Sequence, residues 1–148
     1  MAGSLETVVL VEDNPSHARL ITRALEQSTQ VDRVIHLSDG EMALDYFFRR
    51  GPFANEETVV PSVVLLDLRL PKLDGLEVLR QLKGNEATRR IPVVVLTTSG
   101  SPDDLDAAYD GFVNSYLVKP PAFQDLVELM GEVRSYWAVL NERPGGKG

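Results

Sequence analysis

Four short apolar runs in this chain each end in polar side chains, and this pattern constrains the fold more than any other feature. The runs, with the residues that follow them, are Val8–Val11 before Glu12 and Asp13, Val63–Leu66 before Asp67, Val93–Leu96 before Thr97, and Leu117–Val118 before Lys119. Stretches of helical periodicity separate the runs, which is typical of a parallel sheet covered by helices. Open parallel sheets bind ligands at the carboxyl ends of their strands, so the polar residues are expected to meet at one ligand-binding edge.

The pattern predicts five strands and five helices in one α/β domain. The expected strands are 7–12, 33–36, 63–67, 93–97 and 115–118, and the expected helices are 15–27, 39–50, a third after the turn 71–75, a fourth from 102 and a fifth at 122–140. Asn14 and Ser101 are expected to cap helices, because each precedes a proline suited to the first helical position. Gly84 is expected to end the third helix. The strand 33–36 is short and polar at alternate residues, so we expect it at a sheet edge.

Composition excludes several classes of protein. The 148 residues fit one domain, which we expect at 7–140 between a short lead at 1–6 and a disordered tail at 141–148, with no effector domain attached. The absence of cysteine excludes disulfides and cysteine-ligated metal sites, and the two histidines lie in no ligand-spaced motif. A net charge of -7 disfavours nucleic acid as a partner. Neither a membrane span nor a secretory signal is present, so we expect a cytoplasmic protein.

The residue types at the strand ends suit phosphoryl transfer. A carboxylate that accepts a phosphoryl group attacks an electrophile of the same sign of charge, so a divalent cation has to screen the approach. Asp13 and Asp67 would supply its oxygen ligands; Mg²⁺ suits them, and Mn²⁺ is the alternative ion. Asp67 is the expected nucleophile because it directly follows a buried strand. Thr97 and Lys119 would donate to the phosphoryl oxygens.

Each of these residues also has an ordinary structural interpretation. An acidic pair such as Glu12 and Asp13 after a strand is commonly a solvated turn or a helix cap. A threonine such as Thr97 often simply ends a strand, and a lysine such as Lys119 is usually a surface charge. The joint occurrence of these residues at four strand ends favours a functional site.

The motifs themselves resemble the receiver domains of two-component response regulators. Those motifs are Glu-Asp at 12–13, Leu-Leu-Asp-Leu-Arg-Leu-Pro-Lys-Leu-Asp-Gly at 65–75, Val-Leu-Thr-Thr-Ser at 95–99, and Tyr-Leu-Val-Lys-Pro at 116–120. The resemblance spans residues 7–140. It implies a flavodoxin-like, doubly wound fold, in which a five-stranded parallel sheet of order 2-1-3-4-5 carries helices on both faces.

The resemblance implies a role for each acidic position. Asp67 would take the phosphoryl group from the phosphohistidine of a sensor histidine kinase. Asp13 would bind Mg²⁺ directly, Glu12 would act through water, and the backbone carbonyl of Arg69 would be a third protein ligand. Such a protein is a phosphoryl acceptor that catalyses only its own phosphotransfer and dephosphorylation.

The resemblance also implies a switch around the phosphoryl group. Thr97 and Tyr116 match the hydroxyl and the aromatic ring that move together, and Lys119 matches the phosphate-binding lysine. Thr98 stands where the family often has a smaller residue, which would narrow access to the phosphoryl group. The Lys119–Pro120 peptide bond is expected to be cis.

A narrower resemblance points to the small regulators that work with bacterial and cyanobacterial phytochromes. It rests on the extended segment before residue 63, on the stretch 90–99 and on the pair Tyr136 and Trp137. A bacteriophytochrome is therefore one candidate kinase, although similar chains serve other kinases.

The last predicted helix carries more apolar surface than the sheet needs. Phe123, Leu126, Met130 and Val133 would face the sheet, and additional apolar residues follow at Tyr136, Trp137 and Leu140. We expect a symmetric homodimer through the fourth helix, the fifth strand and the fifth helix. Local packing against the first helix or the tail is the alternative for the additional residues.

Three other functions fit the sequence less well. A haloacid-dehalogenase-type phosphatase would need a second aspartate where Arg69 stands. A nucleotide or flavin site would need a glycine-rich loop after the first strand, where Asp13 and Asn14 stand. A degenerate receiver that binds partners without phosphorylation would be expected to lack an acidic position or the lysine, and both are present.

Overall fold

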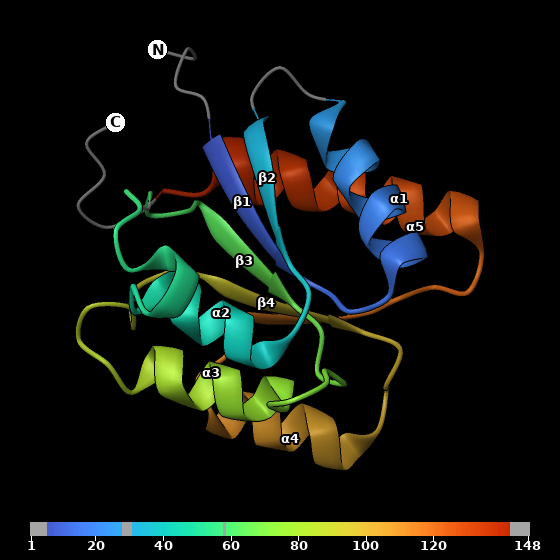
Figure 1. Ribbon diagram of the computed structural model, residues 1–148. Coiled ribbons are helices and arrows are strands. Elements are labelled where there is room, and N and C mark those ends of the chain that lie inside the picture. The colour runs from blue at the N-terminus through green and yellow to red at the C-terminus, as the bar shows by residue number, and fades with distance from the viewer. Residues whose placement is uncertain (1–5, 28–30, 58, 143–148) are drawn as a thin grey trace.

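The computed structural model describes residues 6–27, 31–57 and 59–142, which form a parallel sheet between two layers of helices (Figure 1). The strands are β1 (Glu6–Val11), β2 (Val31–Leu37), β3 (Val63–Leu66), β4 (Val93–Thr97) and β5 (Ser115–Val118). They pair in parallel in the order β2-β1-β3-β4-β5. The doubly wound α/β fold of order 2-1-3-4-5 expected from the sequence is confirmed.

Helices cover both faces of the sheet (Figure 1). They are α1 (Pro15–Glu26), α2 (Gly40–Phe47), α3 (Gly75–Lys83), α4 (Pro102–Asp110) and α5 (Phe123–Val133). Helices α1 and α5 pack on one face, and α2, α3 and α4 pack on the other. A 3₁₀-helix, η1 (Gly51–Phe53), follows α2, and α5 continues as a π-helix, η2 (Arg134–Leu140). Within the described ranges, no helix is long and apolar enough to cross a membrane.

The central strands are continuously apolar because both of their faces are buried. Val9 and Val64 point to the core formed with α2, α3 and α4, while Leu10 and Leu65 point to the core formed with α1 and α5. Alternate residues of one strand thus serve two cores. The sheet is held from both sides, which fixes the positions of the polar residues at its carboxyl edge.

Local capping explains why the helices begin where they do. The Asn14 side-chain oxygen accepts from the peptide nitrogens of Ser16 and His17 at 2.9 and 3.1 Å. The Ser101 hydroxyl oxygen accepts from the peptide nitrogen of Asp104 at 3.1 Å. Both predicted caps are confirmed, and Gly84 ends α3 as expected.

Several sequence expectations are wrong in detail. β2 extends over Val31–Leu37 because its whole length pairs with β1, and α2 ends at Phe47, earlier than expected. Phe123 does not face the sheet: it is 67% exposed at the first turn of α5. No cis peptide bond occurs in the part of the chain that the structure describes, so the Lys119–Pro120 bond is trans, which is the more stable isomer for most X-Pro bonds.

Candidate functional site

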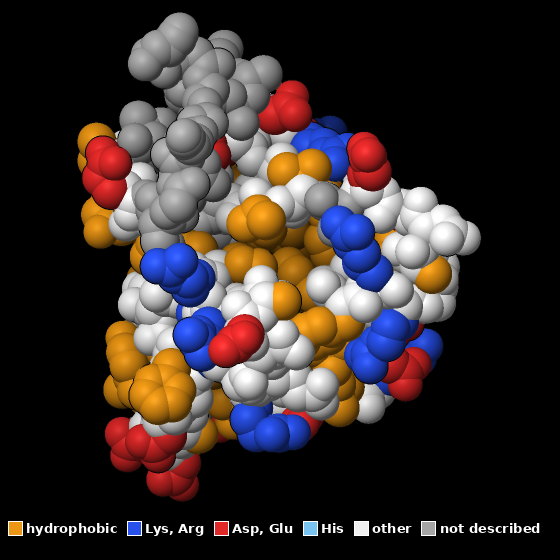
Figure 2. All heavy atoms as spheres, turned by 90° about the vertical axis from the view of Figure 1, so that its left-hand side faces the viewer, with side chains coloured by type: hydrophobic (Ala, Val, Ile, Leu, Met, Phe, Trp, Pro, Cys, Tyr) orange, Lys and Arg blue, Asp and Glu red, His pale blue; other side chains and the backbone are white. Residues whose placement is uncertain are grey.

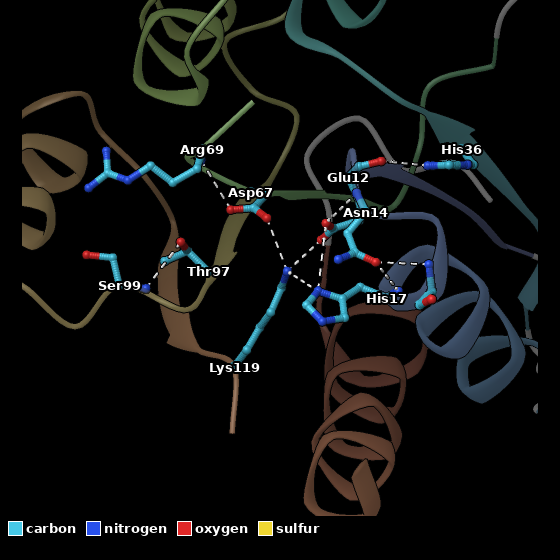
Figure 3. Close-up of polar contacts among 10 residues, drawn as sticks. Glu12, Asn14, His17, His36, Asp67, Arg69, Thr97, Ser99 and Lys119 are labelled. Carbon is cyan, nitrogen blue, oxygen red and sulfur yellow. Dashed lines mark hydrogen bonds and ion pairs between the residues drawn. The ribbon is translucent and has the colours of Figure 1, made fainter. Parts of the chain in front are cut away.

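The polar ends of β1, β3 and β5 converge on one ammonium group (Figure 3). The Lys119 Nζ donates to Glu12 Oε1 at 2.6 Å and to Asp67 Oδ2 at 3.1 Å. The three side chains are only 4%, 2% and 10% exposed, respectively. Residues that lie far apart in the sequence therefore share one buried charged cluster at the carboxyl edge of the sheet.

Glu12, Asp13 and Asp67 together form an acidic group suited to a cation. Each offers a carboxylate oxygen, and these oxygens all lie within 4.8 Å of one another. Asp13 is exposed, whereas Glu12 and Asp67 are buried, so the group opens to solvent on the Asp13 side. Hard carboxylate oxygens that keep a solvent-accessible side fit Mg²⁺, which retains several of its waters.

The charge balance of this cluster is incomplete. Burial raises the pKa of Glu12 above its usual value and outweighs Lys119, which lowers it; Asp67 adds to the increase. One ammonium faces two buried carboxylates and the nearby Asp13, so the site carries net negative charge when all three are ionised. A bound cation would relieve that excess.

His17 also belongs to this cluster, although no role was predicted for it. Its Nδ1 lies 3.2 Å from Lys119 Nζ and 3.9 Å from Glu12 Oε2. The Asn14 cap starts α1 directly after β1 and so turns the first helical residues back over the site. The sequence signal that could have pointed to His17 is the start of a predicted helix within a few residues of Glu12 and Asp13. His36 also approaches from β2, where its Nε2 lies 2.7 Å from the Glu12 carbonyl oxygen.

Thr97 lies at the end of β4, fully buried, and its hydroxyl oxygen accepts from the peptide nitrogen of Ser99 at 3.4 Å. Thr98 is exposed and lines a groove beside the cluster together with His17 and Lys119. The two threonines thus differ: Thr97 lies at the buried end of the strand, and Thr98 lies at the entrance.

A second polar network joins Asp67 to α4. The Arg69 peptide nitrogen donates to Asp67 Oδ1 at 3.2 Å, and its guanidinium donates to Asp104 Oδ2 at 2.5 Å. The Ser99 hydroxyl donates to the same carboxylate oxygen at 2.5 Å. Tyr116 donates its hydroxyl to the Ser99 carbonyl at 2.8 Å. The loops after β3 and β4, the first turn of α4 and β5 are therefore linked.

The family of the chain follows from its sequence. The family model described as "Response regulator receiver domain" matches residues 8–130, most of the chain. The chain belongs to the response regulator receiver family. The acidic group, Asp67, Thr97 and Lys119 lie within the matched residues of the receiver domain.

Two curated relatives resemble this receiver over nearly their full lengths. The probable methanogenesis regulatory protein FilR2 of Methanothrix harundinacea is 51% identical over 138 residues, which cover 93% of this chain and 87% of FilR2. Response regulator Rcp1 of Synechocystis sp. is 41% identical over 132 residues, which cover 89% of this chain and 88% of Rcp1.

Solved structures of related receivers have the same fold. The phosphorylated cyanobacterial phytochrome response regulator RcpA superimposes with a TM-score of 0.90 at 38% identity, covering 96% of this chain and all of RcpA. The Mn²⁺-bound form of Rcp1 superimposes with a TM-score of 0.88 at 39% identity, covering 95% of this chain and 99% of Rcp1. The resemblance to phytochrome response regulators noted in the sequence is therefore confirmed.

Proposed function

We propose that this chain is a single-domain response regulator that accepts a phosphoryl group on Asp67 from the phosphohistidine of a sensor histidine kinase. The observation that carries the proposal is the buried Asp67 carboxylate, which contacts Lys119 and lies beside Glu12 and Asp13. A carboxylate held between an ammonium and a cation-binding group is equipped to meet an anionic electrophile.

The transfer forms one bond and breaks one. An Asp67 oxygen attacks phosphorus, the phosphorus–nitrogen bond to the kinase imidazole breaks, and the leaving nitrogen takes up a proton. Asp67 Oδ1 accepts from the Arg69 peptide nitrogen and Oδ2 from Lys119, so both oxygens are held in place. The Lys119 ammonium and the Thr97 hydroxyl then donate to the new phosphoryl oxygens.

Mg²⁺ is the proposed cofactor, and Mn²⁺ is the alternative ion. Asp13, Asp67 and the Arg69 backbone carbonyl would bind it directly, with Glu12 acting through water. When bound, the ion supplies positive charge that screens the approaching phosphoryl group. The acidic oxygens within 4.8 Å of one another support this assignment, as does a related receiver, Rcp1, solved in an Mn²⁺-bound form.

The signal would leave the site through α4 and β5. Phosphorylation adds about -1.5 to -2 of charge, by analogy with phosphorylated hydroxyls. Thr97 contacts the Ser99 peptide, and Ser99 contacts both Tyr116 and Asp104. A movement of Thr97 toward the phosphoryl group would therefore disturb the attachment of Tyr116 and of the first turn of α4.

The proposed kinase partner is a phytochrome-type histidine kinase, and the proposed location is the cytoplasm. The names of Rcp1 and RcpA support the kinase class, whereas the name of FilR2 refers to methanogenesis. Relatives of similar sequence thus carry names from different signalling systems.

Substitution of Asp67 tests the proposed function directly. After incubation with a small-molecule phosphodonor and Mg²⁺, the intact mass of the parent should increase by one phosphoryl group, and that of Asp67→Asn should not. Asp110→Asn removes an exposed carboxylate from the end of α4 and should be labelled like the parent. A label that persists in Asp67→Asn would contradict the assignment, and an unlabelled parent would favour a receiver that binds partners without phosphorylation.

We also propose a symmetric homodimer through α4, β5 and α5 with its continuation η2. The exposed large hydrophobic residues described on these elements and on the turn between α4 and β5 are Leu105 (38%), Tyr109 (52%), Phe112 (75%), Val118 (48%), Tyr136 (49%) and Leu140 (65%). Trp137 is partly buried against the α1 and α5 core and forms an edge-to-face pair with Tyr136, so Tyr136 and Leu140 are the better candidates for contacts.

Tyr136→Ser is expected to weaken the dimer because it removes a large exposed ring from the proposed interface. Sedimentation velocity of the parent and the variant, each with and without phosphodonor, would measure the change. Phe123→Ser is the control, since Phe123 is a large ring that is even more exposed than Tyr136 but lies beside α1. A parent that stays monomeric in both conditions would contradict the proposed dimer.

A further inference from the structure

The Lys119 ammonium has three N–H groups, and three acceptors surround it among the described residues (Figure 3). Two of the acceptors are the carboxylates of Glu12 and Asp67, at 2.6 and 3.1 Å from Nζ. The third is His17 Nδ1, at 3.2 Å. Three acceptors fix the position of the ammonium, whereas the two carboxylates alone would let it pivot about the line that joins them.

The contact with Lys119 requires the His17 ring to accept. An ammonium carries only donors, so the Nδ1 that faces it has a free lone pair, and the ring proton lies on Nε2. A ring protonated at both nitrogens would place a second cation 3.2 Å from Nζ, which is unfavourable. His17 is therefore a neutral acceptor in this arrangement and adds no charge to the cluster.

The start of α1 fixes the place of the His17 ring. The Asn14 peptide nitrogen donates to Glu12 Oε2 at 3.1 Å, and the Asn14 side-chain oxygen accepts from the His17 peptide nitrogen at 3.1 Å. Pro15 occupies the first helical position, which its restricted φ suits. Asn14 thus ties two of the three acceptors of Lys119 to the first turn of α1.

His17 is the most exposed of the three acceptors. Its side chain is 38% exposed, whereas Glu12 and Asp67 are buried. His17 and Lys119 both line a groove of about 610 Å³ beside the cluster. The imidazole thus holds the ammonium on its open side, where a substitution should change the position of Lys119 more than the fold.

We propose that His17 is a positioning residue for the phosphoryl transfer, because it holds the Lys119 ammonium beside Asp67. The inference rests on the proposed function, in which Lys119 donates to the phosphoryl oxygens. A donor that is already in place when negative charge develops stabilises that charge without having to reorganise first. Without the bond to the imidazole, the ammonium turns toward the groove for part of the time, and Asp67 accepts the phosphoryl group more slowly.

Two substitutions of His17 separate the hydrogen bond from the bulk of the side chain. His17→Leu keeps a branched side chain but removes the acceptor, and it should slow labelling by a small-molecule phosphodonor with Mg²⁺ about tenfold. In His17→Asn, the amide oxygen is as many bonds from the backbone as Nδ1 and should accept from Lys119, so the rate should stay within about twofold of the parent. Arg19→Leu changes an exposed residue of the same helix and should be labelled like the parent.

The effect of His17 should require Lys119. In a Lys119→Met background with Mg²⁺ present, the addition of His17→Leu should cause no further loss of rate, whereas two independent contributions would multiply. Intact mass measured over time gives each rate, and circular dichroism would check the fold of each variant.

Acylation of lysines, mapped by mass spectrometry, reports the position of Lys119 without phosphoryl transfer. Lys119 should react several times faster in His17→Leu than in the parent or in His17→Asn. Figure 2 shows the face at the opposite edge of the sheet, where Lys and Arg side chains surround a hydrophobic depression. Lys83 donates to the Ile91 carbonyl at 2.9 Å, just before β4, and is the internal control that should react equally in all variants.

Equal rates of labelling in the parent and His17→Leu would overturn the positioning role, as would a His17→Asn variant as slow as His17→Leu. A further loss of rate in the Lys119→Met background would also overturn it. An unlabelled parent would contradict the proposed phosphoryl acceptance instead. In that case, equal acylation of Lys119 in the parent and His17→Leu would show that the imidazole does not hold the ammonium, and faster acylation in His17→Leu would show that it does.

Discussion

Replacing Gly75 by alanine should lower the free energy of unfolding by about 3 kcal/mol or more. A Cβ at this position would lie 2.2 Å from the Asp67 carbonyl oxygen and 2.7 Å from the Leu68 Cα. Both are backbone atoms that cannot rotate away, and the Gly75 peptide nitrogen also donates to the Leu68 carbonyl at 2.9 Å. The start of α3 or the loop after β3 has to move.

The same substitution should also reduce phosphoryl acceptance, because the displaced loop carries Asp67 and Arg69. Equilibrium unfolding in urea would measure the loss of stability, and intact mass after incubation with phosphodonor would measure labelling. Gly131→Ala is the matched control: a Cβ there meets only the flexible end of Arg134 at 3.8 Å. Since Gly131 lies inside α5, alanine should stabilise that variant by about 0.5–1 kcal/mol. Equal stability of parent and Gly75→Ala would refute the steric argument.

Gly75 illustrates which parts of the fold could be predicted from the sequence. The turn 71–75 was predicted to lead into a helix, and α3 begins there. The close approach of Gly75 to the Asp67 backbone could not be predicted, because it depends on how α3 packs beside β3. Similarly, β4 and β5 match their predicted limits because each apolar run ends abruptly at a polar residue.

Elements with weaker local signals were predicted less well. β2 is an edge strand with polar residues at alternate positions, so its composition does not mark its ends. Its length is set by its pairing with β1. The spacing of the apolar residues did not predict the change from α5 to the π-helix η2. Phe123 has the spacing of a buried residue but precedes the part of α5 that lies on the sheet.

The candidate site was predictable to the extent that sheet topology determines which residues meet, since parallel strands bring their carboxyl ends to one edge. That rule placed Glu12, Asp67 and Lys119 together. It does not say which side chain bonds to which. The contact of His17 with Lys119 and the contact of Arg69 with Asp104 depend on the direction of a helix turn and of a loop.

Replacing Lys119 by methionine should destabilise the protein strongly at neutral pH in the absence of divalent cations. Methionine keeps an unbranched stem of similar length but removes the ammonium that contacts Glu12 and Asp67. Removing one partner of a buried ion pair costs about 3–5 kcal/mol, because the remaining charge stays buried without compensation. Phosphoryl acceptance should decrease as well, since Lys119 is the proposed donor to the phosphoryl oxygens.

The loss should depend on pH in a defined direction. Burial already raises the pKa of Glu12 above 4.5, and Lys119 opposes that increase, so removing Lys119 raises the pKa further. A group with a raised pKa in the folded state binds more protons folded than unfolded, so stability falls as pH rises through the folded pKa. The deficit of the variant should therefore be small below pH 4.5 and should grow from there toward neutral pH.

Mg²⁺ should restore much of this stability, because an ion bound among Glu12, Asp13 and Asp67 would replace the lost positive charge. A ligand that binds only the folded state also stabilises that state by mass action. Urea unfolding at several pH values, with and without Mg²⁺, would measure both effects. Lys83→Met is the matched control, since the partners of Lys83 Nζ among the described residues are the neutral oxygens of Arg89, Ile91 and Asn114. Its stability loss should change little between pH 4.5 and 8 and should not respond to Mg²⁺. If Lys119→Met behaved in the same way as Lys83→Met, Lys119 would not be the counter-charge of the acidic group.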